Sequence, residues 1–491
     1  MEVVRGIDSL PIELICRIFS LAISPQDAQT DRCRLTLVCR LWREYVEGST
    51  LLWVDISARS DRAYIRRALE RSKASVINLH WSAHIRTRMN LESFMAEAGP
   101  HIARWRSLTV AGRLTLPSWE NALGTLTTAQ APRLESLDLS VVGSGRSVPQ
   151  NAITLFGGAP APSTLKHLTL KRVSVEVEPL SLSGLLSLHL TRVANISTLQ
   201  LLEILRNSQM LQTLSMEDLA GIGSQSLAIP SIELPQLVSL KLEWIAPEGA
   251  NCILSKIRIP NRRQVYICAG IEVSVRSVLF TPTIAHILHT TSPSPEPRSS
   301  DIIVKAEISS GCVIQFRGME LEIYMDGEGV DGEDEVQEIL GWLVEGLGSE
   351  AAACPVRLMI DWSNMDPLRL ATVPSPLFIK HLSIPDSKVF GSFAQPRCVA
   401  THQPPEPPSS GWSLTQMESL SIGFDTIGSQ KEFISMLRNR YEATPGIETI
   451  GRSRCPMSLK SVELRGGPRN EGLVEEIRGI LGEVHVFWRS R

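Results

Sequence analysis

The sequence predicts an α/β protein in which a short helical module precedes a long array of strand-containing repeats. Three observations support this prediction. Residues 1–57 place apolar side chains at helical spacing. Between residues 58 and 270, one pattern recurs, in which apolar residues occupy the first, fourth and sixth of six positions. The chain also has 491 residues, which is too long for a single ordinary core and suits an extended array.

The N-terminal module predicts helices that are apolar on more than one side. The first helix starts near Pro11, which suits a first helical turn because its missing N–H has no partner there. Two apolar stripes follow, namely Ile12, Ile15, Cys16 and Phe19, and Leu14, Ile18 and Leu21. A second helical run is expected from Leu35 to Val46, with Cys39 inside it as a small apolar side chain. So small a module cannot cover both surfaces, so either the repeats or, as we favour, a separate protein must do so.

The repeat pattern is typical of leucine-rich repeats. Seven copies begin at Trp105, Leu134, Leu165, Leu185, Leu211, Leu237 and Leu254, at intervals within the range of that class. Later copies begin at Ile379, Met417 and Leu459, and Val76–Leu79 is a degenerate first strand. Because side chains alternate along a strand, the fourth and sixth positions should point into the solenoid and the positions between them to solvent. An outer helix is expected at Thr198–Asn207.

The repeats depart from the usual pattern after each strand. Where Asn or Cys normally stands, this chain has Val142, Val173, Val193, Leu219 and Ile245. The turn backbone must then find other partners, so we expect an irregular solenoid. From residue 271 to 491 the repeats are degenerate. Disordered or surface loops are expected near 292–300 and 403–410, where Pro and Ser provide little apolar surface to offset the entropy of ordering.

The stretch from Ile7 to Trp53 resembles an F-box. The resemblance is carried, in order, by Leu10-Pro11-x-Glu13-Leu14, Ile18-Phe19, Leu37-Val38-Cys39-Arg40-x-Trp42 and Leu52-Trp53. An insertion, Ala22–Arg32, lengthens the first inter-helix loop. The segments RRALERSKASVINLHW, HIARWRSLTV and APRLESLDL are similar to the F-box/leucine-rich-repeat family of mushroom-forming (basidiomycete) fungi. The expected architecture is therefore a three-helix F-box at 1–57, an irregular leucine-rich-repeat solenoid at 58–270 and its degenerate continuation at 271–491.

The resemblance implies docking without catalysis. F-box proteins bind a Skp-type adaptor, which links them to a cullin–RING ubiquitin ligase, so this chain would be its substrate-recognition subunit. By position, the expected adaptor contacts are Leu10, Pro11, Leu14, Ile18, Val38 and Cys39, whereas Phe19 and Trp42 are expected in the core. The alternative is a leucine-rich-repeat binding or scaffold protein that contacts a Skp-type adaptor without directing ubiquitin transfer.

The solvent-facing strand positions define the expected surface for an unknown protein target. Its charged and titratable members are Asp138, His167, Lys171, His189, Glu217, Lys241 and Glu243. Such a surface offers hydrogen bonds and shape rather than an apolar groove. It is an equally good interpretation that these are ordinary exposed strand positions, which are polar in most sheets.

Composition and motifs argue against other classes of function. The balance of 49 Lys+Arg against 52 Asp+Glu gives no electrostatic case for binding nucleic acid or a membrane. Nine Cys without a CxxC pair favour a reducing compartment, and with no signal peptide or long apolar run we expect a cytoplasmic and/or nuclear protein. Gly327-x-Gly329-x-x-Gly332 matches a dinucleotide fingerprint, but the acidic residues around it favour a simple turn. We expect no catalytic site, metal or cofactor.

Overall fold

The computed structural model contains two compact units, Met1–Arg262 and Arg263–Arg491. It describes residues 10–83, 87–112, 123–124, 126, 130–142, 155–156, 160–174, 182–194, 196–219, 221–222, 230–260, 264–271, 302–307, 311–316, 319–325, 356–361, 379–384, 417–423, 427–441, 459–466 and 469–489. The segments 292–300 and 403–410 and the glycine motif at 327–332 lie outside these residues. None of the described helices combines the length and the apolarity needed to cross a lipid bilayer.

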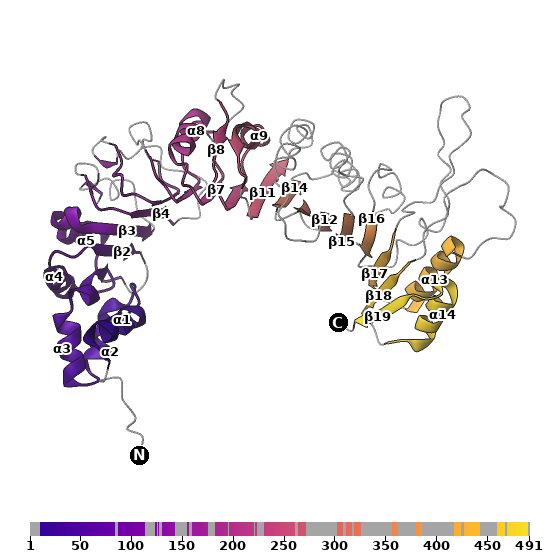
Figure 1. Ribbon diagram of the computed structural model, residues 1–491, viewed down its shortest axis with the longest axis horizontal. Coiled ribbons are helices and arrows are strands. Elements are labelled where there is room, and N and C mark those ends of the chain that lie inside the picture. The colour runs from indigo at the N-terminus through magenta and orange to yellow at the C-terminus, as the bar shows by residue number, and fades with distance from the viewer. Residues whose placement is uncertain are drawn as a thin grey trace, which may run out of the picture. The chain divides into compact units, whose positions relative to one another are not determined.

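Three helices form the N-terminal module, namely α1 (Ile12–Ala22), α2 (Ala28–Thr36) and α3 (Arg40–Gly48), and a 3-10 turn, η2 (Thr50–Trp53), follows them (Figure 1). The prediction of one helix from Leu35 to Val46 is wrong, because α2 ends at Thr36 and α3 starts at Arg40. The segment Ala22–Arg32 is likewise not all loop, since α2 begins at Ala28. The spacing of apolar residues alone does not reveal the break between α2 and α3.

Cys39 explains where the break falls. Its backbone is extended, with φ −157°, and its sulfur accepts a hydrogen bond from the Trp42 N–H at 3.4 Å, which caps the start of α3. Cys39 is exposed, so the prediction that it is a small apolar side chain within a helix is wrong. A thiol can act as a weak acceptor, and here it satisfies one of the N–H groups that a helix start leaves without an intrahelical partner.

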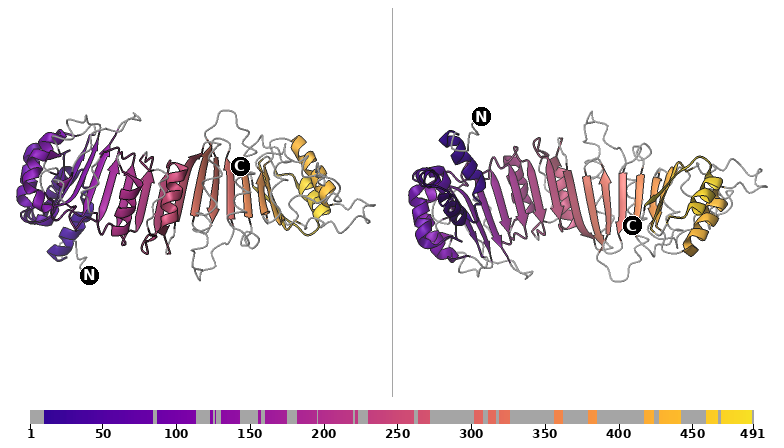
Figure 2. Two further views of the ribbon diagram at one scale, coloured as in Figure 1. Left: turned by 90° about the horizontal axis from the view of Figure 1, so that it is seen from above. Right: turned by 90° about the horizontal axis from the view of Figure 1, so that it is seen from below.

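The first unit is built on a parallel sheet. Its described strands, in spatial order, are β1 (Asp55–Ser57), β2 (Ile77–Ser82), β3 (Trp105–Gly112), β4 (Ser136–Val141), β5 (His167–Lys171), β6 (Ser187–Thr191), β7 (Thr213–Glu217) and β9 (Ser239–Glu243) (Figure 2). The degenerate strand and the first six predicted copies are thus strands of one sheet, whereas β1 was not predicted.

Side chains alternate across this sheet as the pattern predicts. In β4, Leu137 and Leu139 are buried while Ser136, Asp138 and Ser140 are half-buried. The same alternation holds in β6, β7 and β9. Helices α4 (Arg62–Arg71), α5 (Leu91–Ala98), α8 (Thr198–Asn207) and α9 (Pro247–Lys256) lie on one side of the sheet (Figure 1). We call the opposite side, which carries the polar positions, the open face.

Helix α8 has the predicted bounds, and a capping box fixes its start. The Ser197 hydroxyl accepts from the Gln200 N–H, and the Gln200 side chain accepts from the Ser197 N–H. The copy predicted at Leu254, however, is wrong. Leu254 lies in α9, and the residues that follow, Ile257–Arg258 (β10), pair with β8 (Ile232–Glu233) in a separate two-stranded sheet. The spacing of Leu254 and Ile257 fits the last turn of a helix as well as it fits the repeat.

The turns after the strands replace the missing Asn in a regular way. In four repeats the residue after the strand is left-handed, with φ between 50° and 55°, namely Arg172, Arg192, Asp218 and Trp244. The N–H groups of the first three donate to the last carbonyl of the next strand at 2.7–2.8 Å, which extends the ladder. Each left-handed residue precedes a buried apolar one, namely Val173, Val193, Leu219 or Ile245. Val142, the corresponding apolar residue after β4, is instead 52% exposed.

The second unit is a mixed sheet. In spatial order its described strands are β11 (Gln264–Ile271), β14 (Met319–Met325), β13 (Gly311–Phe316), β12 (Ile302–Glu307), β15 (Val356–Asp361), β16 (Ile379–Ile384), β17 (Ser419–Gly423), β18 (Ser461–Arg465) and β19 (His485–Arg489). Strand β13 is antiparallel to both neighbours, and the remaining pairs are parallel. The copies predicted at Ile379, Met417 and Leu459 are strands β16, β17 and β18. Helices α13 (Ile427–Tyr441) and α14 (Glu471–Leu481) lie on one side of β17–β19 (Figure 1).

Candidate functional site

Helix α1 divides its apolar residues between an inner and an outer side. Ile15 and Phe19 are buried, and the Phe19 ring packs on Trp42 with ring centroids 4.6 Å apart. Ile12, Leu14 and Ile18 are between 42% and 51% exposed, although all three would be favoured inside a core. The buried side therefore holds the three-helix module together, and none of the described residues covers the outer side.

Exposed large apolar side chains gather in this module. They are Leu10, Ile12, Leu14, Ile18, Leu21, Leu37, Val38, Leu41 and Leu51, and we call this set the apolar N-terminal surface. Elsewhere among the described residues, such side chains occur singly, as at Leu199 and Met210. The described parts of the repeats in the same unit do not cover this surface. Leaving a large aliphatic side chain fully in water forgoes about 1.5–3 kcal/mol, so a concentration of this kind usually marks a partner site.

All six residues expected to contact the adaptor are exposed, namely Leu10, Pro11, Leu14, Ile18, Val38 and Cys39. Of the two residues expected in the core, Phe19 is buried and Trp42 is half-buried against it. Sequence reasoning missed the exposure of Ile12, Leu37 and Leu51. The loop between α2 and α3 could have been inferred from the run Leu37-Val38-Cys39, in which no helical stripe accounts for three consecutive apolar residues.

Arg32 fastens helix α2 to η2, β1 and α4. Its side chain is 1% exposed and donates to the carbonyl oxygens of Leu52 and Asp55, the latter at 2.8 Å, and to the Tyr64 hydroxyl at 3.2 Å. Its guanidinium also lies over the Trp53 ring, 5.2 Å from the centroid. Burial raises the pKa of Tyr64, while the charge of Arg32 opposes that change. No sequence pattern signalled this residue, because its partners are about 20 to 30 positions away.

A second polar link lies beside Arg32. The Gln29 amide donates to the Asp61 carboxylate at 2.9 Å and accepts from the Asp61 N–H at 3.2 Å. Arg59 forms an ion pair with Asp27 at 3.2 Å. Helix α2 is therefore joined to β1 and α4 by directional bonds, which fix the orientation of the module on the sheet.

The residues expected to bind a target lie on the open face of the first unit, in three rows rather than one cluster. Asp138, His189 and Lys241 share one row across the strands. Lys171, Glu217 and Glu243 occupy the next row, and His167 the third. This arrangement presents alternating charge over a broad surface and converges on no single reacting atom.

Burial sets the protonation preferences of the middle row. It raises the pKa of Asp138, and a hydrogen bond from the Ser140 hydroxyl at 2.8 Å opposes the change. It lowers the pKa of His189, which favours the neutral imidazole. In the neighbouring row, His167 Nδ1 and the Ser187 hydroxyl lie 2.9 Å apart. The face therefore offers donors and acceptors as well as charge.

A cavity of about 260 Å³ opens where the helical module meets the open face. Its lining includes Pro25 from the module and Asp55, His80, Arg106 and His167 from the strands. Burial lowers the pKa of His80, and the nearby Asp55 carboxylate opposes this. Only His167 was predicted among these residues, because Pro25, Asp55 and His80 precede the first copy of the repeat and Arg106 lies outside the alternating positions of that copy.

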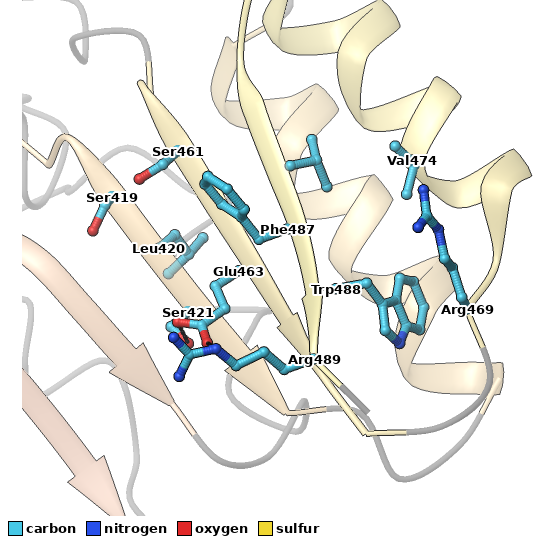
Figure 3. Close-up of a pocket in the computed structure, with 11 residues that line it drawn as sticks. Ser419, Leu420, Ser421, Ser461, Glu463, Arg469, Val474, Phe487, Trp488 and Arg489 are labelled. Carbon is cyan, nitrogen blue, oxygen red and sulfur yellow. Dashed lines mark hydrogen bonds and ion pairs between the residues drawn. The ribbon is translucent and has the colours of Figure 1, made fainter. Parts of the chain in front are cut away.

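The second unit carries a larger pocket, of about 580 Å³, over β17, β18 and β19 (Figure 3). Glu463 lies at its centre and accepts from the Ser421 hydroxyl at 3.2 Å and from Arg465 at 3.3 Å. Burial raises the pKa of this carboxyl. The hydrogen bond and charge of Arg465 and the charge of Arg489 lower the pKa by more than burial raises it, so the net change is downward. The repeat pattern from Leu459 places Glu463 at a solvent-facing position, a signal that sequence reasoning left unused.

No group of three or more His, Cys, Asp or Glu is arranged to hold a metal ion in the portion of the chain that the structure describes. The candidate sites are therefore two kinds of surface. One is apolar and belongs to α1, the α2–α3 loop, α3 and η2; the other is polar and belongs to the strands.

Comparison with known families identifies the helical module. Residues 7–59 match the F-box-like family, a segment that contains α1, α2, α3, η2 and β1. A search of curated proteins finds no match to the chain. Residues 7–59 are thus an F-box-like domain, and a long region of largely parallel sheet with helices follows it. An F-box implies binding to a Skp-type adaptor within a Skp–cullin–F-box complex, in which such proteins are usually non-catalytic, so the domain suggests a substrate adaptor.

Proposed function

We propose that this protein is the non-catalytic substrate-recognition subunit of a Skp–cullin–F-box ubiquitin ligase. The observation that carries the proposal is the apolar N-terminal surface, whose nine large side chains stay exposed on a domain of F-box-like sequence. The described residues of the repeats belong to the same unit and leave this surface exposed, so we expect a second polypeptide to cover it. We expect the complex in the cytoplasm and/or the nucleus.

The adaptor would contact Leu10, Pro11, Leu14, Ile18, Val38 and Cys39. These residues come from the start and outer side of α1 and from the loop that precedes α3, and all are exposed. Cys39 would serve twice, because its sulfur also caps α3. Covering the aliphatic members removes apolar area from water, which is the main source of affinity at such a surface.

The target would bind the open face of the repeats, which we assign to the leucine-rich class and to a family similar to that of basidiomycete fungi. The proposed division is an F-box at 1–57, a solenoid at 58–270 and a degenerate continuation at 271–491. The contacts in the first unit would come from Asp138, His167, Lys171, His189, Glu217, Lys241 and Glu243. The contribution to rate is proximity, because a bound target gains a high effective concentration near the ubiquitin-conjugating enzyme.

A double substitution tests the adaptor interface. Leu10→Asp with Leu14→Asp places two charges where the interface should be dry, and we expect adaptor affinity to fall at least about 100-fold, equivalent to about 2.7 kcal/mol. Both side chains are exposed in the free chain, so thermal stability should not change. Leu199→Asp is the matched control, because Leu199 is 41% exposed on α8 outside the F-box-like domain. Full adaptor capture by the double variant would defeat the proposal.

Ubiquitin transfer distinguishes the receptor from a scaffold. In cells treated with a proteasome inhibitor, proteins bound to the wild-type chain should accumulate ubiquitin, and those bound to the Leu10→Asp, Leu14→Asp variant should not. Equal ubiquitination with both chains would instead favour the alternative, a repeat protein that contacts a Skp-type adaptor without directing transfer.

A further inference from the structure

Two arginines lie side by side at the C-terminal ends of β18 and β19. Arg465 and Arg489 are register partners in this parallel pair. Neighbouring strands run about 4.8 Å apart, so two positive side chains at this register repel each other unless an anion lies between them. Glu463, one alternate position earlier on β18, supplies a single carboxylate for the two guanidinium groups. Counted over the described residues, the cluster therefore has an excess positive charge.

The carboxylate leaves most of the arginine donors unused. Glu463 Oε2 accepts from one terminal nitrogen of Arg465 and from Ser421. Glu463 Oε1 lies 3.0 Å from Arg489 Nε in an ion pair, yet no described group is aligned to donate a hydrogen bond to it. A guanidinium has five N–H donors in a planar fork. Within the described residues, the Arg489 guanidinium forms an ion pair with Glu463 but donates no hydrogen bond.

The arginines are more exposed to solvent than the carboxylate that they share. The side chain of Arg489 is 75% exposed and that of Arg465 is 43% exposed, against 23% for Glu463. Exposed ion pairs contribute little to stability, so the cluster is poorly explained as a fastening for the sheet. Its geometry suits a receptor for an incoming anion, because Glu463 positions two guanidinium groups while leaving their outer edges open.

The pocket beside this cluster, which Glu463 and Arg489 line and Arg465 adjoins through Glu463, fits a peptide. Phe487, next to Glu463 in the register, is 58% exposed and lies on the same side as the Ser419 and Ser461 hydroxyls (Figure 3). An aromatic ring beside hydroxyl groups can cover an apolar side chain and bond to peptide groups. One excess positive charge is too little for a nucleic acid, whose binding requires many phosphate contacts.

We infer that the pocket over β17, β18 and β19 binds an anionic side chain, a carboxylate or a phosphate, of a polypeptide segment that also places an apolar residue on Phe487. This inference rests on the proposed function, since it names the chemical class of target that the sheet selects. The outer edges of Arg465 and Arg489 hold the anion, and Glu463 keeps the two guanidinium groups in place.

Defined peptides test the inference without a known target. The full chain, purified with its adaptor, is titrated with four sets of fluorescent decapeptides that differ only at a fixed central residue, namely Glu, phosphoserine, Gln or Lys. We expect the Glu or phosphoserine set to bind at least 10-fold more tightly than the Gln set, and the Lys set more weakly still. The stronger of the two anionic sets identifies a carboxylate or a phosphate as the natural ligand.

Substitutions with opposite expected effects make the test specific. Arg489→Gln and Arg465→Gln should each remove most of the preference for the anionic peptides. Glu463→Gln should strengthen that preference several-fold, because the Gln amide oxygen can still accept from the guanidinium groups while the competing negative charge is removed. Arg478→Gln is the control for net charge, since Arg478 is exposed on α14 away from the pocket lining. Melting temperatures of all variants show that the comparison is made between folded chains.

The inference is overturned if the four peptide sets bind alike, if Arg478→Gln matches Arg489→Gln, or if Glu463→Gln weakens anionic binding in a folded chain. Adaptor capture, measured on the same preparations, separates this result from the proposed function. Loss of adaptor binding with the peptide preference intact would refute the ligase role alone. Loss of the preference with adaptor binding intact would refute the pocket alone.

Discussion

Replacing Arg32 by Met should loosen helices α1–α3 from η2, β1 and α4. Met fills much of the same space but cannot donate to the carbonyls of Leu52 and Asp55 or to the Tyr64 hydroxyl. Each buried acceptor left without a donor costs about 1–3 kcal/mol. Removing a buried charge recovers part of its desolvation, so we expect a net loss of about 2–4 kcal/mol at the junction.

Hydrogen exchange measures this loss where it should occur. A junction weaker by about 2–4 kcal/mol lets the domain open about 30 to 1,000 times more often, since every 1.4 kcal/mol is tenfold. Amides of α1–α3 should lose protection by that factor, whereas amides of β6 and β7 should keep theirs. Adaptor affinity should change little, because Arg32 is buried and lies outside the apolar N-terminal surface.

Two further variants check the reasoning. Arg32→Lys keeps the charge but replaces a planar fork by a single ammonium group, so we expect an intermediate loss. Arg34→Met is the matched control, because the Arg34 side chain is 76% exposed and its pair with Asp31 is at the surface. If the amides of α1–α3 exchange as slowly in Arg32→Met as in Arg34→Met, the buried guanidinium does not hold the three helices in place.

Three other predictions concern stability. Gly221→Ala should destabilise the first unit by about 1–3 kcal/mol in urea unfolding, because the added Cβ would meet the backbone of Ile196. Gly48→Ala is the control and should be neutral, because its Cβ meets nothing within 4 Å. Equal effects of the two substitutions would contradict this reasoning. Ser197→Ala should lose about 1 kcal/mol by removing a capping box, measured by thermal denaturation. Hydrogen bonding from Arg66 lowers the pKa of Glu97 from 4.5 to about 2. The stabilising effect of the ionised Glu97 is therefore complete above pH 4.5 and is lost as the pH falls toward 2. Glu97→Gln should flatten the acid dependence of the urea midpoint in that range.

The sequence was most informative where one local rule determines position. The strands from Trp105 to Glu243 follow from the alternation of buried Leu with polar residues, and burial in β4 and β6 confirms it. The same rule failed at Leu254, because three-residue spacing is shared by the repeat and by a helix end. It also failed between Leu35 and Val46, where a thiol cap divides an apolar run. Periodicity identifies the buried side of an element better than it identifies the element's ends.

The left-handed turns have a sequence signal, namely the buried apolar residue that follows each of them. Arg192, Asp218 and Trp244 have little in common as side chains, so composition does not reveal their shared φ. What they share is the buried apolar residue that follows, and the sequence does show this residue in register. The missing Asn predicts that the turn backbone lacks a partner, whereas the turn recovers its hydrogen bond by lengthening the strand ladder.

Arg32 marks the limit of local reasoning and lies between the two proposed interfaces without belonging to either. The inner side of α1 and the buried guanidinium on α2 give the domain a fixed orientation on β1 and α4, whereas the outer side of α1 stays apolar and open. A flexible tether would deliver a target over a wide volume and dilute its effective concentration. A domain joined by Arg32 and by the Gln29–Asp61 bonds instead holds the first unit's open face at one orientation to any adaptor bound on α1. The rigid junction therefore matters for transfer even though it touches neither partner, and weakening it should reduce ubiquitination before it reduces binding.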